Sequence, residues 1–249
     1  MNGAATNAPT QPGWGLGDTL IGLLGTIALA AVVSAIALSL VPPRGVIGLA
    51  SQTAGRVVGE QSIDPALGSD FLFEIALLAI PLAYARRHRG SGSTLAVLGL
   101  VRTRIAPALG LVVGGYLGYL AIGLIVSLLL DPSQADATKN LGADAGTIAT
   151  ILVGVIIVAI VPICEEVLFR GFLFAGLRTQ LGPWVAATLT AVLFGAAHLS
   201  GDNANPAAAL QLAALGGMLC FTYHRSGSLW TSIGLHMLNN AISFAVLIV

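Results

Sequence analysis

The chain consists of long apolar runs separated by short polar connections. About 20 predominantly apolar residues allow a helix to cross the hydrocarbon core of a bilayer, and seven runs reach or approach that length. An eighth span is added if the apolar residues 167–177 form a separate segment. The pattern predicts an all-α fold, a polytopic membrane helix bundle. The seven runs cover residues 19–41, 66–85, 105–130, 145–164, 184–199, 207–223 and 229–249.

Two of these runs contain residues that bear on how the helices pack. The run 66–85 is the weakest candidate, because it contains Asp70, Glu74 and Pro81. The run 105–130 has glycines at a four-residue spacing, which is typical of a helix face in close contact with a neighbouring helix. These glycines are Gly110, Gly114 and Gly118.

Three regions follow from this pattern. Residues 1–18 are polar and are predicted to form a disordered tail. Residues 19–144 contain the amino-terminal membrane helices and a basic loop, and residues 145–249 contain the remaining helices.

The composition supports a membrane protein and excludes several other classes. Hydrophobic residues make up 56% of the chain, charged residues 9%, and the mean hydropathy is +0.90. A soluble domain carries roughly 25% charged residues. The formal net charge is zero, so no nucleic acid partner is expected. Cys164 and Cys220 lie in apolar runs and match neither a disulfide framework nor a zinc site.

The distribution of basic residues predicts the orientation in the membrane. Five arginines between the second and third runs have no acidic neighbour, so this connection is expected in the cytoplasm together with the amino terminus. The connection 131–144 has three acids and only Lys139, which suits the opposite side. His224 and Arg225 end a run and are interpreted as an interfacial anchor without chemistry. The five arginines are Arg86, Arg87, Arg89, Arg102 and Arg104.

The first candidate site follows the run 145–164, where Glu165 and Glu166 precede Arg170 by about one turn. Residues four apart share a helix face, so Glu166 and Arg170 are predicted to form an ion pair. Glu165 lies about 100° around the helix and is left to face a cavity, where it can act as a general base or acid. The alternative is a charge cluster that caps a helix end at the membrane surface. Charges inside membranes are rare, which favours function.

Two further clusters join a histidine to a residue four positions away. Phe194 and His198 lie near the end of a run, where a lone histidine is most often structural. His236 and Asn240 share a face well inside the last run, and packing alone does not explain them.

These clusters together supply a carboxylate, two imidazoles and an amide. Such a set can activate a water and stabilise an oxyanion. Glu165, His198 and His236 could also bind zinc with one position open. The sequence has no His-Glu-x-x-His, no Gly-x-Ser-x-Gly, and no apolar run that pairs a serine or cysteine nucleophile with a base. Metal-dependent and metal-free mechanisms both stay open.

The order of these motifs resembles the signature of the CPBP family, the CAAX proteases and bacteriocin-processing enzymes, also called type II CAAX prenyl endopeptidases. The resemblance covers residues 148–249, so 145–249 is interpreted as a CPBP-like catalytic core. It implies a helical intramembrane endopeptidase with a polar intramembrane cavity. The motifs are Glu165-Glu166-Val-Leu-Phe-Arg170, Phe194-x-x-x-His198 and His236-x-x-x-Asn240.

The resemblance also implies a role for each motif residue. Glu165 activates water, His198 positions that water, and His236 with Asn240 stabilises the oxyanion. Glu166, Arg170 and Phe194 support these residues.

The implied cofactor is none, or a weakly held divalent metal such as zinc, because family members are labelled metalloproteases and are also described as acting without a tightly held metal. The expected partners are a membrane protein or peptide substrate and the lipid bilayer. The expected setting is the cell membrane of a prokaryote, since many relatives are prokaryotic.

Two other function classes fit parts of the pattern. A non-catalytic immunity or scaffold membrane protein could keep the motifs, although the presence of every expected polar residue argues against it. A proton-coupled transporter could use the buried acids and histidines as a relay, and its transport should survive loss of Asn240. No feature of the sequence indicates whether a substrate is prenylated.

Overall fold

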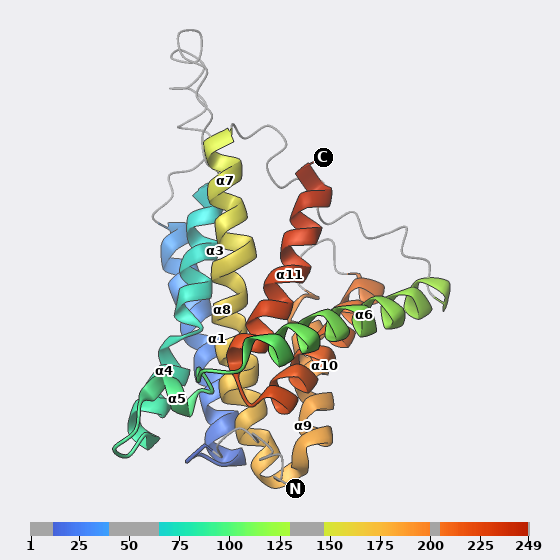
Figure 1. Cartoon of the computed structure of the whole chain (residues 1–249). Helices are drawn as coiled ribbons and strands as arrows, with labels where there is room; N and C mark the ends of the chain where they lie inside the picture. Colours follow the sequence, from blue (N-terminus) through green and yellow to red (C-terminus); the bar gives the residue numbers. More distant parts are fainter. Residues whose placement is uncertain (1–11, 40–64, 130–146, 200–204, 249) are drawn as a thin grey trace, which may run out of the picture.

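The described part of the protein is a bundle of helices. The computed structural model describes residues 12–39, 65–129, 147–199 and 205–248, and these residues form helices and no strand. Figure 1 shows their arrangement. In chain order they are α1 (Leu16–Ser39), α3 (Pro65–Ala76), α4 (Ala79–His88), α5 (Thr94–Val97), α6 (Ile105–Leu129), α7 (Thr147–Val155), η2 (Ile156–Ile160), α8 (Val161–Glu166), η3 (Val167–Phe174), α9 (Ala175–Ala197), α10 (Pro206–Ser226) and α11 (Leu229–Ile248).

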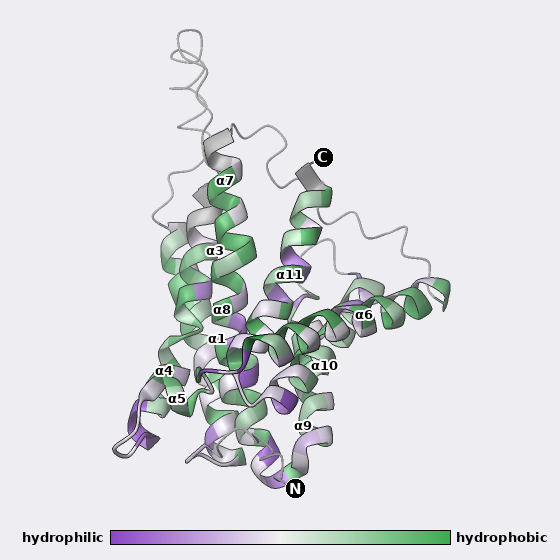
Figure 2. Cartoon of the chain, viewed as in Figure 1, coloured by the Kyte–Doolittle hydropathy of each residue, from purple (hydrophilic) through white to green (hydrophobic). Residues whose placement is uncertain are grey.

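The outer surface of the bundle is apolar. Large side chains such as Ile105 and Leu128 are each 77% exposed, and Figure 2 shows hydrophobic residues along the outer sides of the helices. So much exposed apolar surface is unfavourable in water but is stable in contact with lipid. The prediction of a membrane helix bundle is therefore confirmed.

Four helical segments of the described residues are long and apolar enough to cross a membrane, against seven predicted spans. One of the four, Thr150–Ala197, is 48 residues long and covers most of two predicted spans, 145–164 and 184–199. The last predicted span corresponds to α11, in which His236, Asn239 and Asn240 lower the hydropathy. The four segments are Leu16–Ala37, Ile105–Leu129, Thr150–Ala197 and Pro206–Ser226.

The predicted span over residues 66–85 is not one continuous helix. The segment is divided into α3 and α4, which are 12 and 10 residues long, with a turn at Leu77 and Leu78. Pro81 explains the position of the break, because a proline has no N–H for the carbonyl four residues earlier and its ring clashes with that carbonyl. That carbonyl belongs to Leu77.

A continuous helical path leads from α7 through η2, α8 and η3 into the first part of α9. It ends at Gly182, whose φ of 72° and ψ of 167° lie outside the helical region. Glycine adopts a positive φ without strain, and Pro183 then begins the second part of α9. The chain reverses at this turn, so the two parts of α9 run in opposite directions (Figure 1).

The glycine face predicted on α6 is only partly correct. A side-chain carbon added at Gly118 would lie 2.8 Å from Met218, so this glycine does allow close packing against α10. Gly110 and Gly114 have nothing within 4 Å among the described residues. The second packing glycine is Gly115, where an added carbon would meet Leu235 and Thr222 at 2.9 Å. Spacing alone could not give the direction from which α10 and α11 approach.

Residues 12–18 of the predicted disordered tail are ordered. Residues 1–11 lie outside the described residues, but α1 already begins at Leu16, and the Trp14 side chain is only 1% exposed. The Trp14 indole Nε1 donates a hydrogen bond to the carbonyl of Phe172 at 3.2 Å. A buried indole with a satisfied N–H fixes this segment against η3.

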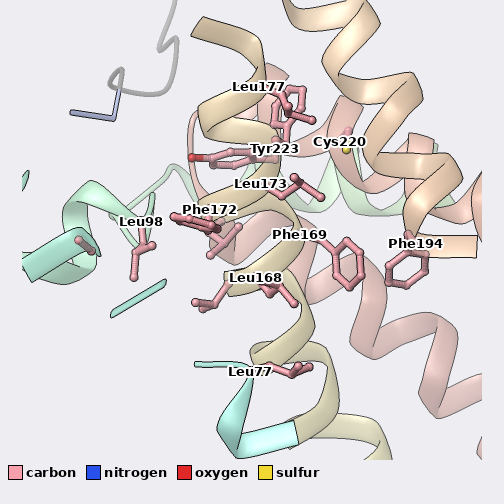
Figure 3. Close-up of a cluster of buried hydrophobic side chains, with 14 of the residues drawn as sticks. Leu77, Leu98, Leu168, Phe169, Phe172, Leu173, Leu177, Phe194, Cys220 and Tyr223 are labelled. Carbon is pink, nitrogen blue, oxygen red and sulfur yellow. The ribbon is translucent and has the colours of Figure 1, made fainter. Parts of the chain in front are cut away.

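The hydrophobic core surrounds the helix that contains η3. Leu168, Phe172 and Leu173 are at most 3% exposed and pack with residues of the neighbouring helices. Figure 3 shows Phe169 and Phe194 pointing toward each other on one side of this helix, with Leu98 and Phe172 on the other. The core therefore holds η3, and with it the adjacent α8, in a fixed rotation.

Candidate active site

The turn at Gly182 brings the first two motifs to the same level of the bundle. Glu165 lies 17 residues before Gly182, and His198 lies 16 residues after it. At 1.5 Å per residue each is roughly 25 Å from the turn. Two helical segments that run in opposite directions from one turn thus place these residues beside each other.

Glu166 and Arg170 form a buried ion pair, as their spacing predicts. Arg170 Nη1 donates to Glu166 Oε1 at 2.6 Å, and both side chains are fully buried. Arg170 Nη2 donates to the carbonyl of Gly216 on α10 at 3.1 Å, and the guanidinium carbon lies 4.5 Å from the centre of the Phe194 ring. Two hydrogen bonds and a cation–π contact offset the cost of burying this charge.

His236 connects the two glutamates. Its Nδ1 lies 3.0 Å from Glu166 Oε1, and its Nε2 lies 3.6 Å from Glu165 Oε2. A carboxylate oxygen can only accept, so Nδ1 carries the hydrogen and donates it to Glu166. The Nε2 atom of the same ring is therefore directed at Glu165.

His198 faces Glu165 from α9 in the same manner. Its Nδ1 donates to the carbonyl of Phe194 at 2.7 Å, which again leaves Nε2 directed toward the glutamate. The distance from Nε2 to Glu165 Oε1 is 3.8 Å. The His198 side chain is 35% exposed and that of Glu165 is 11% exposed, so the site opens on the His198 side.

The three side chains are close together but do not form direct hydrogen bonds with one another. Separations of 3.6 and 3.8 Å exceed the range of a direct bond and are suited to groups that share a water. Glu165, His198 and His236, which belong to three different motifs of the sequence, thus converge in the structure. Their catalytic roles stay predictions.

Phe194 forms one wall of the site. The centre of its ring is 5.0 Å from that of His198 and 5.7 Å from that of His236, and its edge-to-face contact with Phe169 has a centroid distance of 5.1 Å. Phe194 is completely buried. One ring thus limits the movement of both imidazoles and also contacts Arg170.

Asn240 satisfies a carbonyl that the helix itself cannot satisfy. In the wider turn of η2, the N–H of Val161 bonds to the carbonyl of Ile156, five residues earlier. The next carbonyl in that register, Ile157, would need an N–H from residue 162, which is a proline. Asn240 Nδ2 donates to Ile157 at 2.9 Å instead. Its second N–H is left for another acceptor.

Asn240 therefore has a structural role beside its predicted role at the oxyanion, and the two can be separated by mutation. Asn240→Ala should lower the thermal stability, because it leaves the Ile157 carbonyl without a donor, at a cost of about 1–3 kcal/mol. Pro162→Ala supplies a new N–H to that carbonyl, so the same Asn240→Ala change should cost less in this background. Thermal unfolding of the four proteins in detergent measures the difference. Equal costs in both backgrounds would contradict the assignment.

The structure gives no ready arrangement for the predicted metal. Among the described residues, no group of three or more histidine, cysteine, aspartate or glutamate side chains is placed to hold a metal ion. Cys164 and Cys220 are both free and buried. A weakly held cation at Glu165, His198 and His236 stays a prediction, which metal analysis of the purified protein tests.

Apolar helices that enclose a glutamate, two histidines and a buried ion pair define a polytopic membrane protein with a candidate hydrolytic site. Residues 147–242 match the family described as type II CAAX prenyl endopeptidase Rce1-like. The match, to a family of proteases, agrees with the predicted resemblance, and the matched residues include every motif residue from Glu165 to Asn240. No match was found among curated proteins or among solved structures.

Proposed function

We propose that this protein is an intramembrane endopeptidase that hydrolyses a peptide bond of a membrane protein or peptide. The observation that supports this most directly is the convergence of both imidazole Nε2 atoms on the Glu165 carboxylate. Both rings are fixed by hydrogen bonds from Nδ1, so neither ring must turn before it can act. Groups oriented in advance in this way are what general base catalysis requires.

In the proposed reaction, one water lies beside Glu165 and His198 and contacts both side chains. Glu165 takes a proton from this water as its oxygen attacks the carbonyl carbon of the peptide bond. The negative charge that forms on the carbonyl oxygen is stabilised by donors from α11, which are the second N–H of Asn240 and His236 when its Nε2 is protonated. The proton on Glu165 passes to the amide nitrogen, the C–N bond breaks, and a carboxylic acid and an amine are released.

The orientation that we propose places the basic connection between α4 and α6 in the cytoplasm. Arg86, Arg87 and Arg89 are exposed in this region, as the positive-inside rule requires. The amino terminus is then also cytoplasmic, and we propose the cell membrane of a prokaryote as the setting.

The function can be tested on membranes of cells that express either the wild type or Glu165→Ala. We expect at least one peptide fragment to be present with the wild type and absent with the variant, because loss of the base stops hydrolysis. Mass spectrometry of membrane peptides measures this and identifies the substrate. A scaffold or immunity protein would give identical peptide profiles with both proteins, provided that equal amounts reach the membrane.

A further inference from the structure

An apolar groove runs between α9 and α10 on the outside of the bundle. It encloses about 380 Å³, within the range of pockets that bind small molecules. It is open to the surroundings, since the lining residues Trp184 and Val192 are 63% and 56% exposed. The α9–α10 groove is lined by Trp184, Ala187, Ala191, Val192, Gly217 and His224, among others. Small side chains on both helices create the space.

One end of the α9–α10 groove is marked by polar and basic residues. The centres of the Trp184 and His224 rings lie 5.9 Å apart, at the start of one helical segment and the last turn of the other. Arg178 and Arg225 both lie near enough to His224 to act on it electrostatically. Tryptophan and basic residues at helix ends are typical of the level of lipid headgroups.

From this end the groove extends along α9 and α10 on the outside of the bundle. From Trp184 to Val192 the groove follows more than two turns of α9, and from His224 back to Ala213 it follows about three turns of α10. Its lining along this length is almost entirely apolar. The groove therefore passes from the level of lipid headgroups, where the charges are basic, into the hydrocarbon region.

We propose that the α9–α10 groove binds an anionic phospholipid, with one acyl chain along the groove and the phosphate beside His224 and Arg225. A lipid chain gains little from leaving other lipid chains for a protein groove. The preference must therefore come from the headgroup, and basic pockets between membrane helices recognise anionic headgroups. The apolar lining offers few partners for the backbone of a peptide, which favours a lipid as the occupant.

The bound lipid would support the part of α10 that holds Arg170. Gly217 and Cys220 line the groove, and the neighbouring Gly216 accepts the hydrogen bond from Arg170 Nη2. The site thus has a structural connection to the buried ion pair. The binding itself does not depend on the proposed proteolysis and can be measured without a substrate.

The preference for an anionic headgroup is tested with the purified full chain in neutral detergent. Titration with phosphatidylglycerol or phosphatidylcholine, followed by native mass spectrometry, should show tighter binding of phosphatidylglycerol. Arg225→Gln should weaken phosphatidylglycerol binding about fivefold, the effect of one basic residue near an anionic lipid. Arg86→Gln removes an exposed charge on α4 and should leave binding unchanged. Equal affinities for the two lipids, or no effect of Arg225→Gln, would overturn the proposal.

The position of the lipid acyl chain is tested by a substitution that fills the groove. Val192→Trp places a large ring at its open side, whereas Val113→Trp makes the same change on α6, at a residue with a matching exposure of 55%. Both positions face outward, so both variants should fold, which thermal unfolding without lipid checks. We expect Val192→Trp alone to remove the preferential binding of phosphatidylglycerol. Wild-type binding by Val192→Trp, or an equal loss in both variants, would place the lipid elsewhere.

Discussion

Glu165→Gln is expected to abolish peptide hydrolysis while the protein stays folded. Within the described residues no direct hydrogen bond to Glu165 is formed, and its two histidine neighbours are 3.6 and 3.8 Å away. Glutamine has the same shape but cannot take a proton from water, so turnover should fall about 10²–10⁴-fold, the contribution of a general base. The measurement is the rate at which the purified protein cleaves the substrate that mass spectrometry of membrane peptides identifies. Thermal unfolding tests whether the variant is folded.

The same assay tests whether His198 acts on the same water. His198→Ala alone should lower turnover, but adding it to Glu165→Gln should cause almost no further loss, because groups that act as a unit are not additive. Additive losses would assign the two residues to different steps.

We also expect the wild-type rate to survive a zinc chelator, since Glu165 and the histidines suffice in the proposed mechanism. A loss that added zinc reverses would instead place a metal at these residues.

The parts of the site that the sequence predicts best are those set within one helix. The Glu166–Arg170 pair follows from a four-residue spacing, and the structure has it at 2.6 Å. The sequence leaves open whether residues 167–177 form a separate span or continue the Glu165 helix, and the structure continues that helix to the turn at Gly182. This continuation, followed by the turn at Gly182, is what brings Glu165 and His198 to the same level of the bundle.

Contacts between distant segments could not be predicted in the same way. His236 could bond to either of two adjacent glutamates. The rotation of α11 about its axis decides that Nδ1 bonds to Glu166, which is 70 residues away in the sequence. The contact from Asn240 to Ile157 depends on the wide turn of η2, which has no reliable sequence signal, although Pro162 marks the carbonyl that needs a partner. Pro81 was a comparable signal for the break between α3 and α4.

The Glu166–Arg170 pair should give the largest effect on stability. Glu166→Gln leaves a fully buried guanidinium without its counter-charge, which costs about 3–5 kcal/mol. The melting temperature in detergent should therefore fall strongly. Glu165→Gln is a matched control, because it makes the same chemical change one residue away at a side chain without such a partner. The two adjacent glutamates are thus expected to differ: one carries the reaction and the other holds the structure.

Glu166 also accepts a hydrogen bond from His236, and a double variant separates this role from the ion pair with Arg170. Leucine at both Glu166 and Arg170 removes both buried charges, and replacing a buried pair with apolar residues is often neutral or stabilising. The double variant should therefore be more stable than Glu166→Gln. It also removes the acceptor that fixes the hydrogen on His236 Nδ1, so Nε2 is no longer reliably directed at Glu165.

Recovered stability without recovered turnover would identify Glu166 as a positioning residue for His236 as well as the partner of Arg170. We expect turnover by the double variant to stay far below that of the wild type, even where its melting temperature approaches the wild-type value. A merely structural pair would behave differently, because restoring the fold would restore the rate. Measuring both quantities on the same preparations separates the two roles, since the ion pair acts on folding and the hydrogen bond to His236 acts on the orientation of the reacting groups.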